Sequence, residues 1–327
     1  MSAAWPSLQN LVGGVVACGD GGQAYRAVRS LLDQELPAGA QWSAIWVVVA
    51  PDDPSTMDAA ERAARSDPRV RLVREDRRRG KSAALVEVIG RARGDLLILL
   101  NGDAQAEPGA VSALVHAAER STSPVFGVMG RAVLPAGDSS GLRGALELLW
   151  GLHHRFNAEL HAKREGTHLS DELLALPIAH LPPLAEGIIN DGAFSGAWIA
   201  GRGGELHYAD SARVRIALPR RFIDLLRQRR RIQVGHRQVE RISGRPPSTI
   251  EGMAARQPRR AWGIVRAEVR SRPDGVRALL VLGAAEVAAF LLSRLDLVGG
   301  STSWAVWPRV EVAHSEPAEG AAPGTAA

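Results

Sequence analysis

Cysteine and aromatic residues are scarce in this sequence, and each scarcity excludes a class of protein. Cys18 is the single cysteine, which excludes an internal disulfide framework and a cysteine-rich zinc site, and fits a reducing compartment. The two tyrosines and five phenylalanines are too few for nucleic-acid recognition by base stacking. The first ten residues lack a positive segment followed by an apolar one, so we expect no secretory signal and a cytoplasmic location.

Two nucleotide-binding motifs are also missing. No Gly-x-Gly-x-x-Gly follows the first predicted strand, residues 11–17, which argues against a dinucleotide oxidoreductase. A Gly-Lys-Ser sequence occurs at residues 80–82, but the upstream glycine that a phosphate-binding Walker loop requires is absent. The sequence therefore does not predict a nucleoside triphosphatase.

Composition and charge leave several partners open. The 327 residues are 46% hydrophobic and 23% charged, which is typical of a soluble globular protein. The net charge of +5 is concentrated in two basic blocks, residues 71–81 and 213–231. Nucleic acid, an anionic membrane surface and a phosphorylated substrate would each suit these blocks. Charge alone does not choose among them.

Strand and helix patterns alternate through the first third of the chain. Apolar runs predict strands, and apolar residues at helical spacing predict helices between them. The predicted strands are residues 11–17, 44–50, 70–73 and 96–100, and the predicted helices are residues 23–32, 56–65, 82–92 and 109–119. This alternation is typical of a doubly wound, mostly parallel sheet flanked by helices.

Acidic side chains follow the predicted strands where each strand ends. The loops at residues 19–21, 51–53 and 102–103 all lie at the carboxyl edge of such a sheet, so they can share one ligand. Asn101 and Asp103 close the most apolar strand, and their oxygens can hold a hard divalent cation, which in turn can hold a diphosphate.

The rest of the chain is less regular. Residues 126–133 predict another strand, and residues 142–184 predict helices with proline-rich interruptions. After Gly244 the composition is that of a linker, and the tail from residue 316 is expected to be disordered. The apolar segment 276–297 is interrupted by charges, Glu286 among them. We therefore expect a helix that packs on the domain or lies in a membrane interface, rather than a spanning helix.

Five motifs occur in an order that points to one family. They are residues 78–85 (RRGKSAAL), 101–110 (NGDAQAEPGA), 170–176 (SDELLAL), 188–192 (IINDG) and 228–232 (QRRRI). Together they resemble the family 2 glycosyltransferases over about residues 11–240. The resemblance implies a glycosyltransferase-A-type fold for residues 1–245, followed by a linker and apolar helix at 246–310 and a disordered tail at 311–327.

The resemblance also implies an activity and a donor site. The activity is an inverting transfer of a sugar from a nucleotide-diphosphate donor to an acceptor hydroxyl, with Mg²⁺ or Mn²⁺ bound at Asp103. Lys81 would assist with phosphate, and a lysine beside helix amides suits an anion. The nucleotide would be held by the first loop and the second strand end, and the residues implied are Cys18, Gly19, Asp52, Asp53, Asn101 and Gly102. Alternatives remain: residues 51–54 as an Asx turn, and Lys81 as part of a solvated basic loop.

The later motifs imply the catalytic residues. Asp191 would be the base that takes the acceptor proton. Gln228, Arg229 and Arg231 would bind the diphosphate, and residues 170–176 would line the acceptor site. The alternatives are that Asp191 caps a helix, that the arginines form a basic helix face, and that the acids near residue 171 cap or solvate a helix.

Departures from the family pattern keep other functions open. Asn101 replaces an acid, Ile232 replaces a tryptophan, and Gly192 follows Asp191, so a catalytically impaired relative that still binds nucleotide is one alternative. A basic nucleic-acid-binding protein is another, but it leaves the strand-end acids unexplained. The acceptor stays unidentified. A lipid-linked or envelope glycan acceptor, with peripheral association at the inner face of the membrane, is a hypothesis that the apolar segment suggests.

Overall fold

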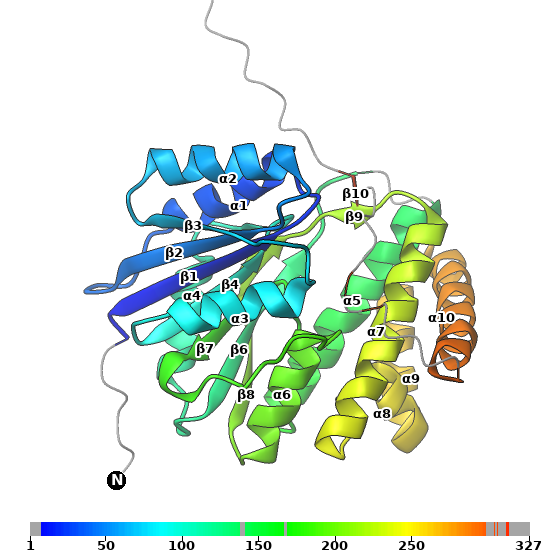
Figure 1. Ribbon diagram of the computed structural model, residues 1–327. Coiled ribbons are helices and arrows are strands. Elements are labelled where there is room, and N and C mark those ends of the chain that lie inside the picture. Colours follow the sequence, from blue (N-terminus) through cyan, green and yellow to red (C-terminus); the bar gives the residue numbers. More distant parts are fainter. Residues whose placement is uncertain are drawn as a thin grey trace, which may run out of the picture.

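A mixed eight-stranded sheet forms the centre of the computed structural model, which describes residues 8–137, 141–166, 169–298, 304, 306, 312 and 313. The strand order is β3-β2-β1-β4-β7-β6-β8-β5 (Figure 1). The strands are β1 (Asn10–Ala17), β2 (Gln41–Val49), β3 (Val70–Arg74), β4 (Leu96–Asn101), β5 (Gln105–Ala106), β6 (Phe126–Val133), β7 (Leu173–Pro177) and β8 (Glu205–Arg215).

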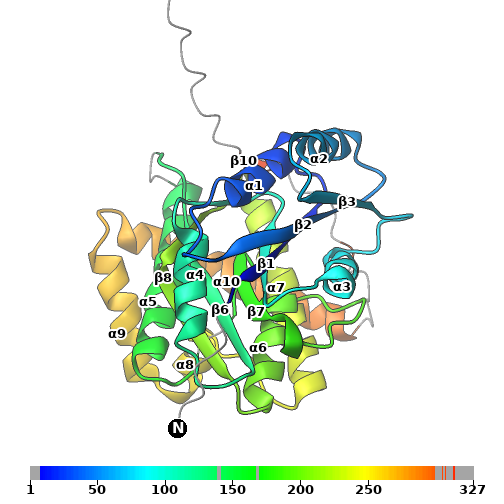
Figure 2. The same ribbon diagram turned by 90° about the vertical axis from the view of Figure 1, so that its left-hand side faces the viewer.

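The first four long strands are parallel, as the alternation predicts. β1 pairs with β2 and β4, and β2 pairs with β3. Leu11 and Val15 pack on one face of the sheet with α1 (Gly22–Leu32), α2 (Pro54–Ser66) and α4 (Ala110–Glu119), whereas Val12 packs on the other face with α3 (Lys81–Arg91). Figure 2 shows α1 and α2 on one side of these strands and α3 on the other. Helices on both faces explain why residues 96–100 are apolar throughout.

β7 corrects the prediction of helices for residues 142–184. α5 (Gly141–Ala162) is helical as expected, but β7 is a fully buried strand inserted between β4 and β6 and antiparallel to both. An apolar run of five residues does not distinguish a buried strand from a buried helix turn. The register pairs Leu173 with Leu100, so the residues just before β7 lie beside the carboxyl end of β4.

A layer of helices follows the sheet in the sequence: α6 (Asp191–Gly201), α7 (Phe222–Ser243), α8 (Ile250–Arg256), α9 (Pro258–Arg270) and α10 (Gly275–Val298). The expectation of a linker is wrong for residues 250–270, which form α8 and α9. Their apolar residues pack with α5 and α10 in a separate core cluster. Short elements complete the described chain: η1 (Ile178–His180), β9 (Leu218–Pro219) and β10 (Val312–Ala313). The predicted disordered tail from residue 316 lies outside the described residues.

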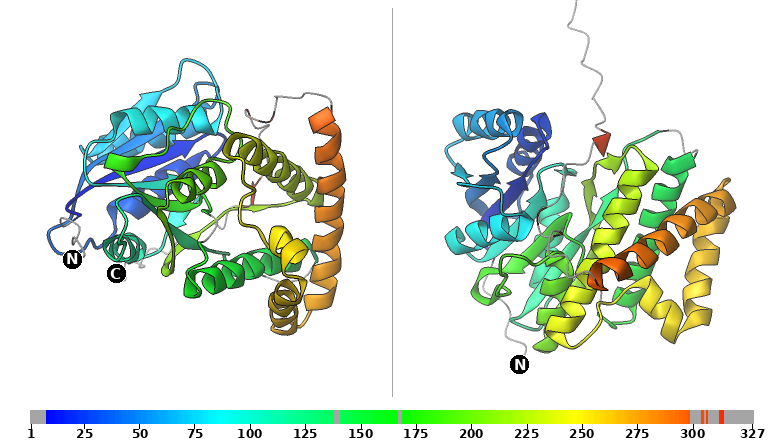
Figure 3. Two further views of the ribbon diagram at one scale, coloured as in Figure 1. Left: turned by 90° about the horizontal axis from the view of Figure 1, so that it is seen from below. Right: turned by 45° about the vertical axis from the view of Figure 1, so that its right-hand side comes forward.

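α10 is the predicted apolar helix, and it packs against α7 and α5 (Figure 3). Ala278, Leu282, Ala285 and Ala289 are buried on one face, while the other face exposes Leu280, Val287, Leu291 and Leu295. Among the described residues this is the one helix long and apolar enough to cross a membrane, a test that core helices also pass. The buried face fits the expectation of a helix packed on the domain.

Candidate functional site

A cavity of about 720 Å³ lies at the carboxyl ends of β1 and β4. Its walls come from the loop after β1, the loop after β4, the residues before β7, and α7. This is the edge at which open α/β sheets bind ligands, and the volume lies in the range of ligand pockets. The predicted residues that line it are Cys18, Gly19, Lys81, Asn101, Gly102, Asp103, Gln228, Arg229 and Arg231.

Asp52, Asp53 and Asp191, which were also predicted, do not line this cavity in the described part of the chain. Asp53 is buried and caps the N-terminus of α2, where one carboxylate oxygen accepts a hydrogen bond from the Thr56 amide. The other accepts from the Gly19 N–H at 2.5 Å. Burial raises the pKa of Asp53, but these hydrogen bonds outweigh it and the pKa is lowered. The Asx alternative therefore describes Asp53, which holds the Gly19 turn from behind.

Asp52 is exposed on the same turn. Its Oδ2 lies 4.0 Å from Nη1 of Arg78, which does line the cavity. An exposed pair at this distance contributes little to stability. The structure therefore places neither Asp52 nor Asp53 on the cavity wall, and their side chains contact Arg78 and Gly19, which do line it.

Asp20 is a site residue that the sequence reasoning did not select. Its Oδ2 accepts a hydrogen bond from the Cys18 N–H at 2.7 Å. Burial and the charge of Asp103 raise the pKa of Asp20 well above its ordinary value. The two carboxylates therefore lie close enough to repel each other. The sequence places Asp20 in the first strand-end loop, but it does not show in which direction the side chain points.

Gly102 lets the two acidic loops approach each other. A Cβ at this position would lie 2.5 Å from the Asp20 Oδ2 and 2.8 Å from the Ala17 Cα, distances too short for any side chain. Burial raises the pKa of Asp103 too, against the opposing charge of Lys81. The missing side chain of Gly102 thus brings a pair of partly buried carboxylates together at the end of β4.

This acid pair fits a divalent cation that also binds the substrate. In the described residues no three His, Cys, Asp or Glu side chains come together to hold a metal ion, so an ion here would take other ligands as well. Magnesium-like ions are commonly held by one or two carboxylates together with substrate phosphates and water. Asp20 and Asp103 supply that number, and the cation would relieve the repulsion that raises the pKa of Asp20.

Lys81 lies at the centre of a second charged group. It is the first residue of α3, its ammonium forms an ion pair with Asp171, and its Nζ lies 3.4 Å from Oδ1 of Asp191. Burial alone would lower the pKa of Lys81, but the charges of Asp171 and Asp191 outweigh it and raise the pKa. The same contact lowers the pKa of Asp171 to about 2 despite its burial. The solvated-loop alternative is wrong for Lys81, whose side chain is 20% exposed.

Asp191 is buried at the first position of α6. The helix cap is Asn190, whose Oδ1 accepts from the Ala193 N–H at 2.9 Å, so the alternative that Asp191 is the cap is wrong. Burial and the charge of Asp171 raise the pKa of Asp191. A carboxylate with a raised pKa is a stronger base than an ordinary aspartate.

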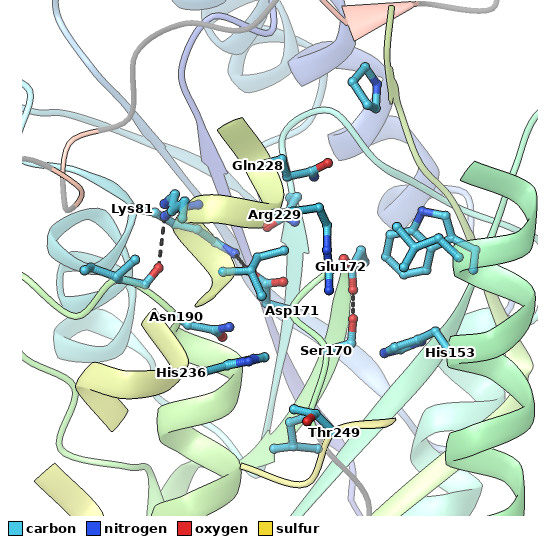
Figure 4. Close-up of a pocket in the computed structure, with 18 of the residues that line it drawn as sticks. Lys81, His153, Ser170, Asp171, Glu172, Asn190, Gln228, Arg229, His236 and Thr249 are labelled. Atoms are coloured by element: carbon cyan, nitrogen blue, oxygen red, sulfur yellow. Dashed lines mark hydrogen bonds and ion pairs between the residues drawn. The ribbon is translucent and has the colours of Figure 1, made fainter. Parts of the chain in front are cut away.

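Asp171 and Glu172 precede β7 and line the cavity, and neither was selected as a site residue. The sequence signal was the motif at residues 170–176. The alternative of acids that cap or solvate a helix is wrong, because this segment leads into a buried strand. Glu172 accepts a hydrogen bond from the Ser170 hydroxyl, and burial together with the charge of Asp171 raises its pKa to about 8. Figure 4 shows Asp171 and Glu172 in the middle of the site, with Asn190 and His236 on one side and His153 on the other.

Arg229 and Arg231 of α7 contact different parts of the structure. Arg229 forms an ion pair with Glu286 of α10, and its Nη2 lies 3.6 Å from Oε1 of Glu251. Arg231 instead donates from Nη2 to the Ile189 carbonyl at 3.0 Å, and the charges of Asp171 and Asp191 act on it. The structure therefore brings Arg231 to the acids, while Arg229 connects α7 to the C-terminal helices. The alternative of a solvated basic face does not describe either residue.

Comparisons with known proteins agree with this geometry. The sequence profile of Glycosyl transferase family 2 matches residues 15–147. No curated protein is significantly similar in sequence. The fold is similar to the mannosyltransferase PcManGT from Pyrobaculum calidifontis, solved with GDP-Man and Mn²⁺, with a TM-score of 0.56 and 19% identity over 90% of this chain and 81% of that one.

Two other solved structures are more distant. GalNAc-T7 with UDP, GalNAc and Mn²⁺ has a TM-score of 0.48 and 14% identity over 65% of this chain and 44% of that chain. S. aureus TarS 1-349 has a TM-score of 0.43 and 12% identity over 90% of this chain and 92% of that chain. The likeness to PcManGT shows that the chain has a fold of the glycosyltransferase-A type. The family 2 glycosyltransferase profile matches its N-terminal part, residues 15–147.

Proposed function

We propose that the enzyme transfers a sugar from a nucleotide-diphosphate donor to an acceptor hydroxyl, with inversion and with the help of a divalent cation. The observation that carries the proposal is a pair of acidic groups at one sheet edge. Asp20 and Asp103 form the first group, and Asp171 and Asp191 form the second. Lys81 interacts with acids of both groups, so a donor bound at the first would lie beside the second.

The first group would hold the donor. Asp20 and Asp103 would bind Mg²⁺ or Mn²⁺, which when bound neutralises the diphosphate charge and so favours departure of the nucleoside diphosphate. The backbone of Cys18 and Gly19 lines the same part of the cavity, and Asp53 holds that turn in place. The Mn²⁺ in the PcManGT structure supports a metal of this class.

The second group would move the proton. In a single displacement, the acceptor oxygen attacks the anomeric carbon while its proton passes to the Asp191 carboxylate. The bond from that carbon to the diphosphate oxygen breaks, and its electron pair leaves with the nucleoside diphosphate. The charge of Lys81 acts against the rise in the pKa of Asp191 and so favours its ionised form. Attack opposite the leaving group gives inversion.

Arginine and glutamine side chains from α7 would complete the donor site. Arg231 lies near the acids, and Gln228 lines the cavity, so we assign both to the diphosphate. We also retain the proposal for Arg229, which would need to exchange part of its contact with Glu286 for phosphate. A guanidinium suits this task because it binds phosphate in a bidentate manner.

Gly192 bears on the alternative of an impaired enzyme. A Cβ at this position would lie 2.6 Å from the carbonyl oxygen of Leu169, so α6 could not pack there with any larger residue. The glycine therefore has a packing reason, and it does not by itself signal the loss of a catalytic acid. Asn101 and Ile232 still line the cavity in place of the family's usual residues.

The test is binding of a panel of nucleoside diphosphates and sugar nucleotides with and without Mn²⁺. We expect the wild type to bind one nucleotide class in a metal-dependent manner and Asp103→Ala to lose this binding. Asp33→Ala is the matched control, because Asp33 is exposed and does not line the cavity. Nucleotide binding of equal affinity with and without Mn²⁺, and in wild type and Asp103→Ala, would overturn the proposed metal site. Donor hydrolysis by the wild type would separate a live enzyme from an impaired relative.

A further inference from the structure

The cavity continues away from the acidic residues into an apolar arm. This arm lies among α5, α8, α9 and α10, and its chemistry differs from that of the sheet edge. The apolar residues that line it are Leu149, Trp150, Leu152, Phe156, Ile250, Ala254, Ala261, Trp262, Val265, Leu279 and Leu282. A diphosphate does not require such a wall, since it is a strongly polar group that gains little from apolar contact.

The arm is built into the packed helical layer. Leu152, Phe156, Ala261 and Leu282 line it, and all four belong to the buried core cluster that joins α5, α9 and α10. Trp262 also lines it and is 60% exposed, so the arm reaches the protein surface at α9. An apolar path therefore runs from the surface to the sheet edge.

Charges near the junction of the two parts are already paired. Arg229 and Glu286 both line the cavity, and they form an ion pair with each other. An uncharged chain could pass this pair without leaving a buried charge unpaired. Beyond it, Asp171 and Glu172 line the polar end, where an acceptor hydroxyl would have to arrive.

We propose that the acceptor is an amphiphile, with its hydroxyl-bearing end at Asp171 and Glu172 and a long apolar chain in the arm formed by α5, α8, α9 and α10. This inference rests on the proposed glycosyltransferase site and names the class of its acceptor. The chain would replace water along the arm, and the hydrophobic effect would supply most of the acceptor's affinity.

Two glycines offer a matched pair of variants. Gly283 lines the arm and Gly263 does not, yet at both positions an added Cβ would meet nothing within 4 Å. Gly283→Phe would therefore fill the arm, and Gly263→Phe would add the same ring elsewhere on the helical layer. Ala254→Leu and Ala255→Leu form a second pair on the exposed side of α8, because Ala254 lines the arm and Ala255 does not.

The experiment measures binding of methyl, octyl and decyl β-D-glucosides to the full chain by calorimetry, below the concentration at which micelles form. We expect affinity to rise by up to about threefold per methylene group between octyl and decyl. Gly283→Phe and Ala254→Leu should weaken decyl glucoside binding at least tenfold, while Gly263→Phe and Ala255→Leu should not. Should one variant fail to fold, the other pair still decides.

The outcomes separate this inference from the proposed function. Equal affinity for methyl and decyl glucosides, or equal effects of the arm variants and their controls, would overturn the acceptor proposal. Mn²⁺-dependent nucleotide binding is measured on the same samples, and we expect Gly283→Phe to retain it. If the wild type lacks that nucleotide binding, the proposed function itself fails, regardless of the affinities measured for the glucosides.

Discussion

The loops on the donor side of the molecule and the helices on the acceptor side are held by different forces. On the donor side, short hydrogen bonds from backbone amides to Asp20 and Asp53 fix the loop after β1. On the acceptor side, ion pairs join residues far apart in the sequence, such as Arg229 with Glu286 and Arg230 with Asp296. The proposed donor side is thus fixed by hydrogen bonds within and between neighbouring loops of the N-terminal sheet. The proposed acceptor side depends on how the C-terminal helices dock.

This difference has a consequence for function. Local hydrogen bonds keep a loop in one conformation, which suits a site that must recognise a fixed group such as a diphosphate. Ion pairs between helices can be lost when one helix shifts, and Arg229 of α7 is held by Glu286 of α10. The predictions below test whether the two sides behave as separate units.

The largest effect is expected at the junction of the two sides. Asp191→Asn removes the proposed base but keeps the size of the side chain, so turnover should fall by roughly 10²- to 10⁴-fold. Mn²⁺-dependent donor binding should persist, because the donor side is built from other residues. Rates and donor affinity are measured on the same protein, and Asp33→Asn, at an exposed residue away from the cavity, serves as the control. A rate within twofold of wild type would remove Asp191 from the proposed chemistry.

A large loss of stability is expected on the acceptor side. Glu286→Gln leaves the partly buried Arg229 with a weaker partner, and because the pair is not fully buried the loss should be up to about 3 kcal/mol. Denaturant unfolding measures the loss, and Arg229→Met combined with Glu286→Met should recover part of it. Asp33→Asn is the contrast, since its pair with Arg29 is exposed and should matter by less than about 1 kcal/mol. If the double variant were no more stable than Glu286→Gln, this account of the pair would be wrong.

A smaller loss is expected on the donor side. Asp53→Ala removes the cap of α2 and the hydrogen bond to the Gly19 amide, so the free energy of unfolding should fall by about 1 to 2 kcal/mol. Donor affinity should fall with it, because Gly19 lines the cavity. Asp53→Asn retains one oxygen, which can accept from only one of these two amides, and should recover about half of the loss. Unfolding curves that do not separate the alanine and asparagine variants would contradict this role.

The same contrast explains what the sequence could predict. The strands β1 to β4 and the helices between them follow from their alternating apolar patterns, because turn residues separate each strand from the next helix. β7 could not be predicted, because five apolar residues fit a strand or a helix turn. Glu172 becomes a site residue through the antiparallel register of β7 with β4, which is a long-range pairing.

The helices α8 and α9 could not be predicted from the sequence for another reason. Arg, Pro and Ser dominate the sequence around α8 and α9, so composition indicates a linker. These helices are stabilised by packing Met253, Ala261 and Ile264 against α5 and α10, which no local pattern reveals. Tertiary packing, more than propensity, decides whether short helices form.

The last effect concerns the pH dependence of stability. The pKa of Glu172 is about 8 in the folded protein and 4.5 ordinarily, so between these values the folded state holds a proton that the unfolded state has released. Stability should therefore be greatest near the low end of this window and decrease as the pH rises toward 8. Glu172→Gln, which stays uncharged, should flatten that decrease. Thermal unfolding midpoints across the window measure it, and identical slopes for wild type and variant would show that Glu172 titrates near its ordinary pKa. Asp53→Asn should leave the slope in this window unchanged, because the lowered pKa of Asp53 places its titration below the window. The pH dependence of the two variants thus distinguishes the two sides of the site.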